Sequence, residues 1–240
     1  RQMCIRDSLM NEGQVSGRLG VMGQPVVGEA MQVARDVMLS EYLNIPIHIA
    51  HVSCRMSADI IAWAKKRGAK VTAETTPHYL LLDESEMEGY NTLAKVNPPL
   101  RTPDDRAAMR EAVKNGTIDI IVTDHAPHIA MEKNTTLDLA PNGITGLDLS
   151  LTLIWSLVRD GVITEADLIR LMAEKPAEIF GLPCCRFNPG DPADFILFDP
   201  ELEWTVTPET LYSKSFNTPY LNKTVRGRTA HSWIGGVKLF

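Results

Sequence analysis

The sequence has few cysteines, little excess charge and no long apolar run, and each shortage argues against a class of protein. The four cysteines, Cys4, Cys54, Cys184 and Cys185, lack zinc-finger spacing, and the last two are adjacent residues that do not easily bond to each other. We therefore expect four free thiols in a reducing compartment, with the cytoplasm as the default location.

Charge and hydropathy narrow the class of protein further. The chain has 30 acidic and 24 basic residues, a formal net charge of -6, and no basic stripe that could follow nucleic-acid phosphates. Its longest apolar stretches, such as residues 151–158, are too short to span a bilayer, and no signal pattern opens the chain. With 240 residues and 44% hydrophobic content, it can bury the core of one large domain, with or without a small appendage.

The middle of the chain alternates between helical and strand patterns. Apolar periodicity predicts helices over 25–42 and 56–67, and strands over 45–50, 70–75 and 118–122. Thr102, Pro103 and Asp105 match an N-cap, a first-turn proline and an acidic third position, which open a helix that ends at 115–116. These alternations predict an α/β fold with parallel βαβ units. Three strands cannot close a barrel of eight, so the chain is either a small open sheet or a barrel that lacks its front half.

The sequence patterns at the two ends of the chain differ from the strand–helix alternation in the middle. Helices are predicted over 147–159 and from Thr164, which forms a capping box with Asp167. Short strands over 194–199, 203–207 and 224–239 predict a small β subdomain. Residues 1–8 fit neither pattern and look like a non-native leader. We therefore expect a leader over 1–8, an α/β part over 9–185 and the subdomain over 186–240.

The stretch 121–128, IVTDHAPH, is the first candidate for chemistry, because an apolar strand ends there in Asp124. This carboxylate could bind a metal and move a proton to and from the water that the metal polarises; a helix N-cap is the alternative. His51 also follows a strand, and its imidazole suits zinc, although packing or a hydrogen bond is the simpler explanation for the residue taken alone. His48, three residues earlier, should point to the opposite face of an extended strand.

Three further segments could serve such a site. His78 could support the site or be a structural turn residue. The loop 97–101, NPPLR, is stiffened by two prolines, and its Asn97 and Arg101 would be well held for a polar ligand; a rigid connector is the alternative. The loop 142–146, NGITG, precedes a helix and offers backbone N–H groups that could hold an anionic substrate.

Taken together, the strings HIAHVS, TAETTPHYLLL, KVNPPLR, IVTDHAPH and NGITGLD are similar in order and spacing to the dihydroorotases of the single-chain bacterial class, members of the amidohydrolase superfamily. The resemblance runs from about Leu9 to the end of the chain. It implies that the three strands are the last three of a TIM-type β/α barrel. It also implies the interconversion of N-carbamoyl-L-aspartate and dihydroorotate in pyrimidine biosynthesis.

The same resemblance assigns roles to individual residues. It implies one or two zinc ions per full-length subunit, with His51 and Asp124 as metal ligands and Asp124 also as the general acid/base. It implies substrate contacts from four further residues: Asn97, His128, Asn142 and Gly143.

The sequence also departs from the resemblance. The family's further ligands, a His-x-His pair, a bridging Asp and a fifth-strand His, are not found here. Because two ligands rarely hold zinc tightly, we expect this polypeptide alone to be inactive and assign the activity to a full-length parent.

Two other functions stay open. An allantoinase or hydantoinase is the nearest enzymatic alternative, against which His128 argues. A non-catalytic dihydroorotase-like subunit that scaffolds aspartate transcarbamoylase is the other, and the retention of His51 and Asp124 argues against it. A homodimer and binding to the transcarbamoylase are the partner hypotheses.

Overall fold

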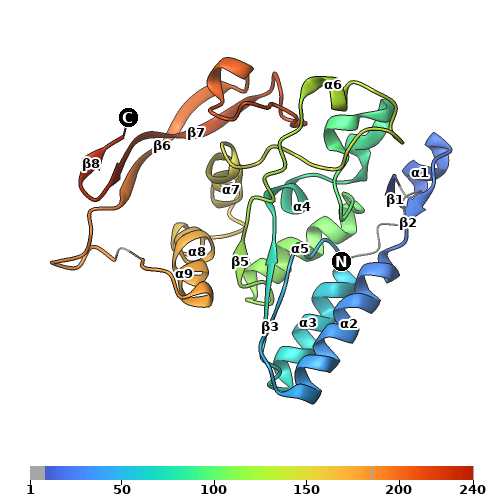
Figure 1. Ribbon diagram of the computed structural model, residues 1–240, viewed down its shortest axis with the longest axis horizontal. Helices are drawn as coiled ribbons and strands as arrows, with labels where there is room; N and C mark the ends of the chain where they lie inside the picture. Colours follow the sequence, from blue (N-terminus) through green and yellow to red (C-terminus); the bar gives the residue numbers. More distant parts are fainter. Residues whose placement is uncertain (1–8, 185, 240) are drawn as a thin grey trace.

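A three-stranded parallel sheet lies at the centre of the computed structural model, which describes residues 9–184 and 186–239. Its strands pair in chain order: β3 (Ile47–Ile49), β4 (Val71–Thr75) and β5 (Ile120–Ile121). The helices that precede and follow these strands are α2 (Val26–Leu43), α3 (Arg55–Lys66) and α5 (Pro103–Lys114) (Figure 1). The predicted parallel βαβ order is therefore confirmed, although each strand is shorter than its pattern indicated.

The two faces of this sheet differ in chemistry. Side chains of Ile49, Val71 and Ala73 join the main core, which also takes residues from all the surrounding helices: Val37, Ile61, Met109 and Ile154. The opposite face carries His48, Thr72 and Glu74, which contact one another. A parallel sheet is normally apolar on both faces, so a polar second face indicates a function.

Helix boundaries follow the predicted caps. The Thr102 hydroxyl accepts the N–H of Asp105 at 3.1 Å, and the Asp105 carboxylate accepts from the same hydroxyl at 2.7 Å. Thr164 and Asp167 form the equivalent capping box for α8 (Glu165–Ile169). That helix runs on through a π-helical turn, Arg170–Glu174, into α9 (Lys175–Phe180).

One helix start and several short elements differ from the prediction. Helix α7 (Ser150–Arg159) begins three residues later than expected, because Leu147 to Leu149 form a turn. The elements that the sequence did not predict are mostly too short to show a period. They are β1 (Met10–Asn11), α1 (Gln14–Leu19), β2 (Gly23–Gln24), α4 (Pro77–Leu81), α6 (Ala130–Lys133) and the 3-10 helices Glu84–Tyr90, Thr92–Ala94 and Pro208–Thr210.

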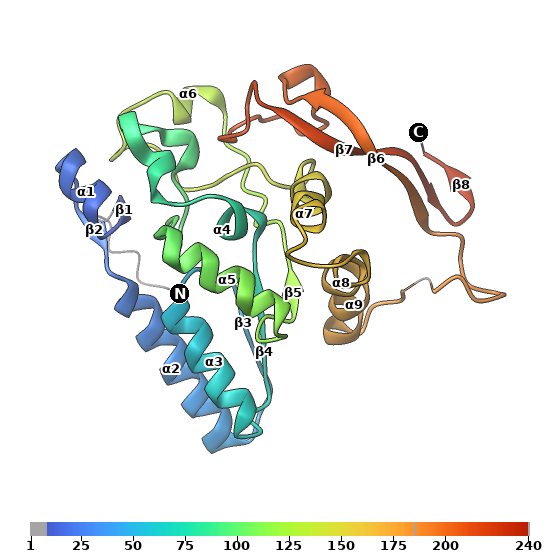
Figure 2. The same ribbon diagram turned by 180° about the vertical axis from the view of Figure 1, so that it is seen from behind.

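The C-terminal part forms an antiparallel sheet of β6 (Phe195–Thr205), β7 (Thr224–Ile234) and β8 (Val237–Lys238). It lies on the opposite side of the molecule from α2 and α3 (Figure 2). The two strands predicted over 194–199 and 203–207 are one strand interrupted by a bulge, where Asp199 Oδ1 accepts the N–H groups of Glu201 and Leu202. The predicted domain boundary at residue 186 stays a prediction.

This sheet packs on α7 through aromatic side chains. Trp155 meets Phe198 edge to face, with ring centroids 5.4 Å apart. Gly227 lies opposite them at φ 96°, and a Cβ there would lie 2.6 Å from the Phe198 ring. Only glycine fits this position, because any side chain would push the two layers apart.

Some predictions concern residues at the margins of the structure. Residues 1–8, with Cys4, and Cys185 lie outside the described residues. Within the described residues, no helix is both long and apolar enough to cross a bilayer. Cys54 is a buried thiol beside Glu29 and Ser57, and its pKa is raised to about 12 by burial.

Candidate active site

His51, Glu74 and Asp124 lie together at the carboxyl ends of the three parallel strands. His51 follows β3 by two residues, Glu74 lies in β4 next to its last residue, and Asp124 follows β5 by three. The Glu74 Oε1 lies 3.0 Å from His51 Nδ1, an ion-pair contact without the alignment of a hydrogen bond. On the other side of the ring, His51 Nε2 lies 3.6 Å from Asp124 Oδ1. The structure thus brings together the two proposed metal ligands.

The backbone of both proposed ligands is in the left-handed region, with φ 55° at His51 and 44° at Asp124. Such conformations are uncommon outside glycine and cost energy, so they often mark functional positions. The turn at His51 also explains why the prediction for His48 was wrong. His48 Nε2 lies 2.9 Å from Glu74 Oε2, so both imidazoles contact one carboxylate. Strand alternation does not reach His51, because the strand ends at Ile49.

Burial and neighbouring charges shift the pKa of each member of this group. Burial raises the pKa of Glu74, but contacts from His48 and His51 outweigh burial and bring it to about 2. The Glu74 contact raises the pKa of His51 against the effect of burial, with help from the Asp124 charge. Burial raises the pKa of Asp124, although the His51 charge opposes it. Asp124 is therefore the carboxylate of the group that is better suited to accept a proton.

His78 is the buried neighbour of this group. It lies in α4 rather than in a turn, is 3% exposed, and its Nε2 has no hydrogen-bond partner within the described part of the chain. Burial, with a smaller contribution from His51, lowers its pKa to about 3. His78 is therefore neutral at physiological pH.

His128, Asn142 and Gly143 meet where two loops cross. His128 Nε2 donates to the Asn142 carbonyl at 3.0 Å. Gly143 has φ 145°, and a Cβ there would lie 2.9 Å from His128 Nε2 and 2.7 Å from the Ala126 Cβ. Glycine at 143 is therefore what lets the two loops touch. The four-residue separation of Asp124 and His128 places this contact in the loop that also carries the proposed metal ligand.

Asn97 belongs to a third loop that joins the other two. The N–H of Gly143 donates to the Lys95 carbonyl at 2.9 Å, two residues before Asn97. On the other side, Pro98 lines a cavity of about 300 Å³ with His48 and His51. The loop of Asn97 therefore lies between the two groups, and the role of Asn97 in substrate binding stays a prediction.

Three of the backbone N–H groups that the sequence offered for an anionic substrate in residues 142–146 are hydrogen-bonded within the protein. The N–H of Gly143 donates to Lys95, and that of Thr145 donates to the Asn217 carbonyl at 2.9 Å. The N–H of Gly146 donates to His125 Nδ1 at 3.3 Å. Because these donors already have acceptors within the protein, they cannot also cradle an anion.

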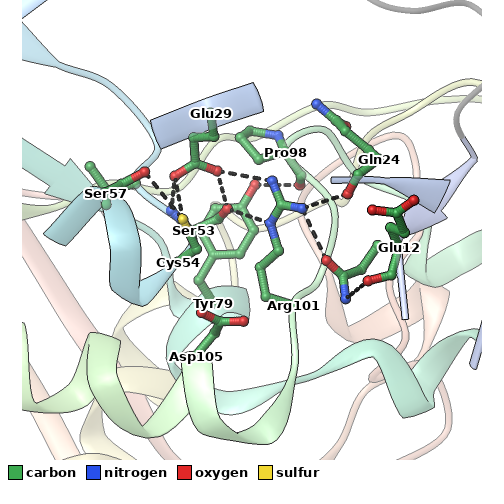
Figure 3. Close-up of polar contacts among 12 residues, drawn as sticks. Glu12, Gln24, Glu29, Ser53, Cys54, Ser57, Tyr79, Pro98, Arg101 and Asp105 are labelled. Atoms are coloured by element: carbon green, nitrogen blue, oxygen red, sulfur yellow. Dashed lines mark hydrogen bonds and ion pairs between the residues drawn. The ribbon is translucent and has the colours of Figure 1, made fainter. Parts of the chain in front are cut away.

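Arg101 is a connector and does not present its charge to a ligand (Figure 3). Its guanidinium is buried and donates four hydrogen bonds. Nε donates to Ser53 Oγ, Nη1 to Asn11 Oδ1 and to the Gln24 carbonyl, and Nη2 to Glu29 Oε2. Glu29 in turn accepts the N–H and hydroxyl of Ser53. This network holds the loop after β3, and with it His51, against α2.

Sequence reasoning missed several buried polar residues around the site. Glu74 could have been found, because it follows Thr72 by one strand period and stands near a strand end. Lys95 and Lys133 gave no local signal. Both are buried, and their Nζ atoms donate to backbone carbonyls, those of Leu137 and Ala140 for Lys95 and of Thr92, Lys95 and Pro141 for Lys133.

The donors present fit part of a metal site. One imidazole nitrogen and one carboxylate oxygen 3.6 Å apart are spaced like two ligands of an ion that binds each at about 2.0–2.2 Å. Glu74, behind the imidazole, is the kind of carboxylate that orients a histidine ligand. Across residues 9–184 and 186–239, no group of three His, Cys, Asp or Glu side chains is placed to hold a metal. The described residues therefore offer two candidate ligands, His51 and Asp124.

Comparison with known families decides the class of protein. The amidohydrolase family matches residues 30–238 of this sequence. The chain belongs to the amidohydrolase family. Among curated relatives of this amidohydrolase chain, the dihydroorotase of Syntrophotalea carbinolica is 47% identical over 232 residues, covering 97% of this chain and 55% of the relative. The dihydroorotase of Geobacter metallireducens is 50% identical over 228 residues, covering 95% and 54%. The chain thus spans about half the length of these relatives.

Solved structures show where else this amidohydrolase architecture occurs. A D-hydantoinase superposes with a TM-score of 0.84 at 26% identity, covering 97% of this chain and 51% of its own. The L-hydantoinase (dihydropyrimidinase) of Arthrobacter aurescens gives 0.82 at 26% identity, covering 90% and 49%. The predicted α/β class and amidohydrolase membership are confirmed.

Proposed function

We propose that the protein carrying this sequence is a dihydroorotase that interconverts N-carbamoyl-L-aspartate and dihydroorotate in pyrimidine biosynthesis. The observation that carries this proposal is the meeting of His51 and Asp124, 3.6 Å apart, at the carboxyl ends of β3 and β5, the two outer strands of the parallel sheet. The 47–50% identity to dihydroorotases favours this substrate over a hydantoin, because the hydantoinases share the fold at 26% identity.

The polar face of the sheet supports an incomplete barrel. In a β/α barrel the helices cover the outside, and the ends of several strands supply the catalytic residues. Here the helices pack on the face of Ile49 and Ala73, while His48 and Glu74 occupy the other. We place residues 9–185 in the last part of such a barrel, with residues 186–240 as the β subdomain.

Zinc is the metal that we propose, with His51 Nε2 and Asp124 as the ligands that this chain provides. When bound, the ion would polarise the substrate carbonyl and lower the pKa of water. Glu74 holds the imidazole so that Nε2 faces Asp124.

Asp124 moves the proton in the proposed reaction. In the hydrolytic direction its carboxylate takes a proton from water as oxygen bonds to the ring carbonyl carbon. It then delivers that proton to the ring nitrogen as the C–N bond breaks. In the biosynthetic direction the same proton moves in reverse, and water leaves. The raised pKa of Asp124 suits both steps.

The substrate contacts of the proposal are Asn97, His128, Asn142 and Gly143. His128 Nδ1 lies 3.3 Å from Glu132 Oε2 and its Nε2 contacts the Asn142 carbonyl, so the ring lies between its own loop and the loop of Asn142 and Gly143. Since the N–H of Gly143 is occupied, its contribution is its lack of a side chain, which lets His128 approach Asn142.

The test is dihydroorotate hydrolysis by the full-length protein with added zinc. Asp124→Ala should lower kcat by at least about 100-fold, because it removes a proton carrier and a ligand. Asp59→Ala, at an exposed position on α3, is the matched control and should keep full activity. Equal rates for the wild type and Asp124→Ala would remove Asp124 from the mechanism. Turnover of hydantoin in place of dihydroorotate would favour the hydantoinase alternative.

Partners and location complete the proposal. We place the enzyme in the cytoplasm as a homodimer, with aspartate transcarbamoylase as a further partner. Mass measured in solution, with and without the transcarbamoylase, tests both assemblies. A full-length protein that binds the transcarbamoylase but does not turn over dihydroorotate would be the scaffolding subunit instead.

A further inference from the structure

Asn217 lies between the two loops that carry the proposed catalytic and substrate residues. It belongs to the segment between Pro208–Thr210 and β7, 89 residues away from His128 in the chain. Its side-chain oxygen accepts the backbone N–H of His128 at 2.9 Å and the hydroxyl of Thr145 at 2.6 Å. Its side-chain nitrogen donates to the carbonyls of Ala126 at 2.9 Å and Gly143 at 3.1 Å. The Asn217 side-chain amide thus makes two hydrogen bonds to each of the two loops.

The chemistry of this amide indicates a structural bond and not a ligand contact. Asn217 is 3% exposed, and its side chain uses both donors and both acceptor directions within the protein. Its backbone carbonyl accepts the N–H of Thr145 as well. No capacity is left for a substrate. Only an asparagine has two donors and two acceptor directions at this reach, because aspartate lacks the donors and glutamine is one methylene longer.

The two loops also contact each other directly, and the N–H groups of Gly146 and Leu147 donate to His125 Nδ1 at 3.3 and 3.1 Å. His125 and Ile144 form an isolated bridge, and Ala126 donates to the Ile144 carbonyl at 3.1 Å. Those contacts join the loops close to the strand end. Asn217 joins them further out, where the His128 ring reaches the Asn142 carbonyl.

We propose that Asn217 is a positioning residue, through which the C-terminal segment sets the distance between the loop of Asp124 and His128 and the loop of Asn142 and Gly143. This inference rests on the proposed function for the roles of those residues. It assigns to the C-terminal segment an indirect part in substrate binding, through the positions of the two loops.

Hydrogen–deuterium exchange tests the inference directly. Asn217→Asp keeps the shape of the side chain but removes both donors and places charge beside two carbonyl oxygens. We expect roughly thirtyfold faster amide exchange in residues 125–128 and 142–146, because two hydrogen bonds that hold these loops are lost. Exchange in α3 and α5 should not change. Asn217→Ser, which removes the amide without adding charge, should show the same pattern. Asn222→Asp, at an exposed position in the same segment, is the matched control and should exchange like the wild type.

A kinetic measurement on the full-length enzyme separates positioning from general stability. Displaced His128 and Asn142 should raise KM for dihydroorotate about tenfold or more, with a smaller change in kcat. Unchanged exchange in the two loops, or equal acceleration throughout the protein, would overturn the role of Asn217. A wild-type enzyme without dihydroorotate hydrolysis would overturn the proposed function instead, while the exchange result would still decide whether Asn217 holds the loops.

Discussion

Replacing Glu74 by glutamine tests the electrostatics of the site, because one carboxylate holds two imidazoles there. The substitution keeps the shape and removes the charge. A fall in pKa from 4.5 to about 2 corresponds to about 3 kcal/mol of favourable interaction, at about 1.4 kcal/mol for each pKa unit. The Glu74 side chain is only 9% exposed, so solvent screens little of this interaction. We therefore expect Glu74→Gln to lower the free energy of unfolding by about 3 kcal/mol at pH 6.

The pH dependence of this loss has a definite sign. Because the folded-state pKa of Glu74 is lower than the unfolded-state pKa, the unfolded chain binds more protons between pH 4.5 and about 2. The contribution of Glu74 is complete above pH 4.5 and disappears as the pH falls through that window. The difference between wild type and Glu74→Gln should therefore shrink to about half by pH 3.

Urea unfolding at pH 6 and pH 3 measures both quantities. Glu111→Gln, at an exposed position on α5, is the control and should change stability by less than about 0.5 kcal/mol. NMR titration should also show a lower His51 pKa in Glu74→Gln, since the contact that raises it is lost. A loss below about 1 kcal/mol at pH 6, or an equal loss at both pH values, would refute the reasoning.

Three further substitutions test the scaffold around the site by urea unfolding. Arg101→Met should cost about 3–5 kcal/mol because it leaves the buried Glu29 carboxylate without its cation, and adding Glu29→Gln should recover part of the loss; full stability of the single variant would contradict a buried ion pair. Gly227→Ala should cost about 1–3 kcal/mol, because its Cβ would lie 2.6 Å from an aromatic carbon at positive φ, whereas Gly17→Ala, with open space around it, should be harmless. Thr102→Ala should cost about 1 kcal/mol through loss of the N-cap of α5, and an unchanged midpoint would show that the cap contributes nothing.

Local patterns in the sequence were enough to predict the alternating strands and helices and the helix caps. Each of these features depends on residues that lie close together in the sequence. They are the strand–helix alternation, the capping boxes at Thr102 and Thr164, and the strand ends before His51 and Asp124. The convergence of His51 and Asp124 also follows from sequence, because parallel strands in one sheet end at the same edge.

Tertiary structure decided which polar groups meet. His48 and His51 both contact Glu74 because the left-handed backbone at His51 interrupts the alternation of side chains along the strand. No pattern of side chains in the sequence predicts that conformation. Arg101 bonds inward because segments 77 and 90 residues away supply its acceptors. Asn217 bonds loops 72 to 91 residues away. Periodicity reports which face of an element is apolar, but the pairing of buried polar atoms depends on where distant segments are packed, and only the folded chain specifies that.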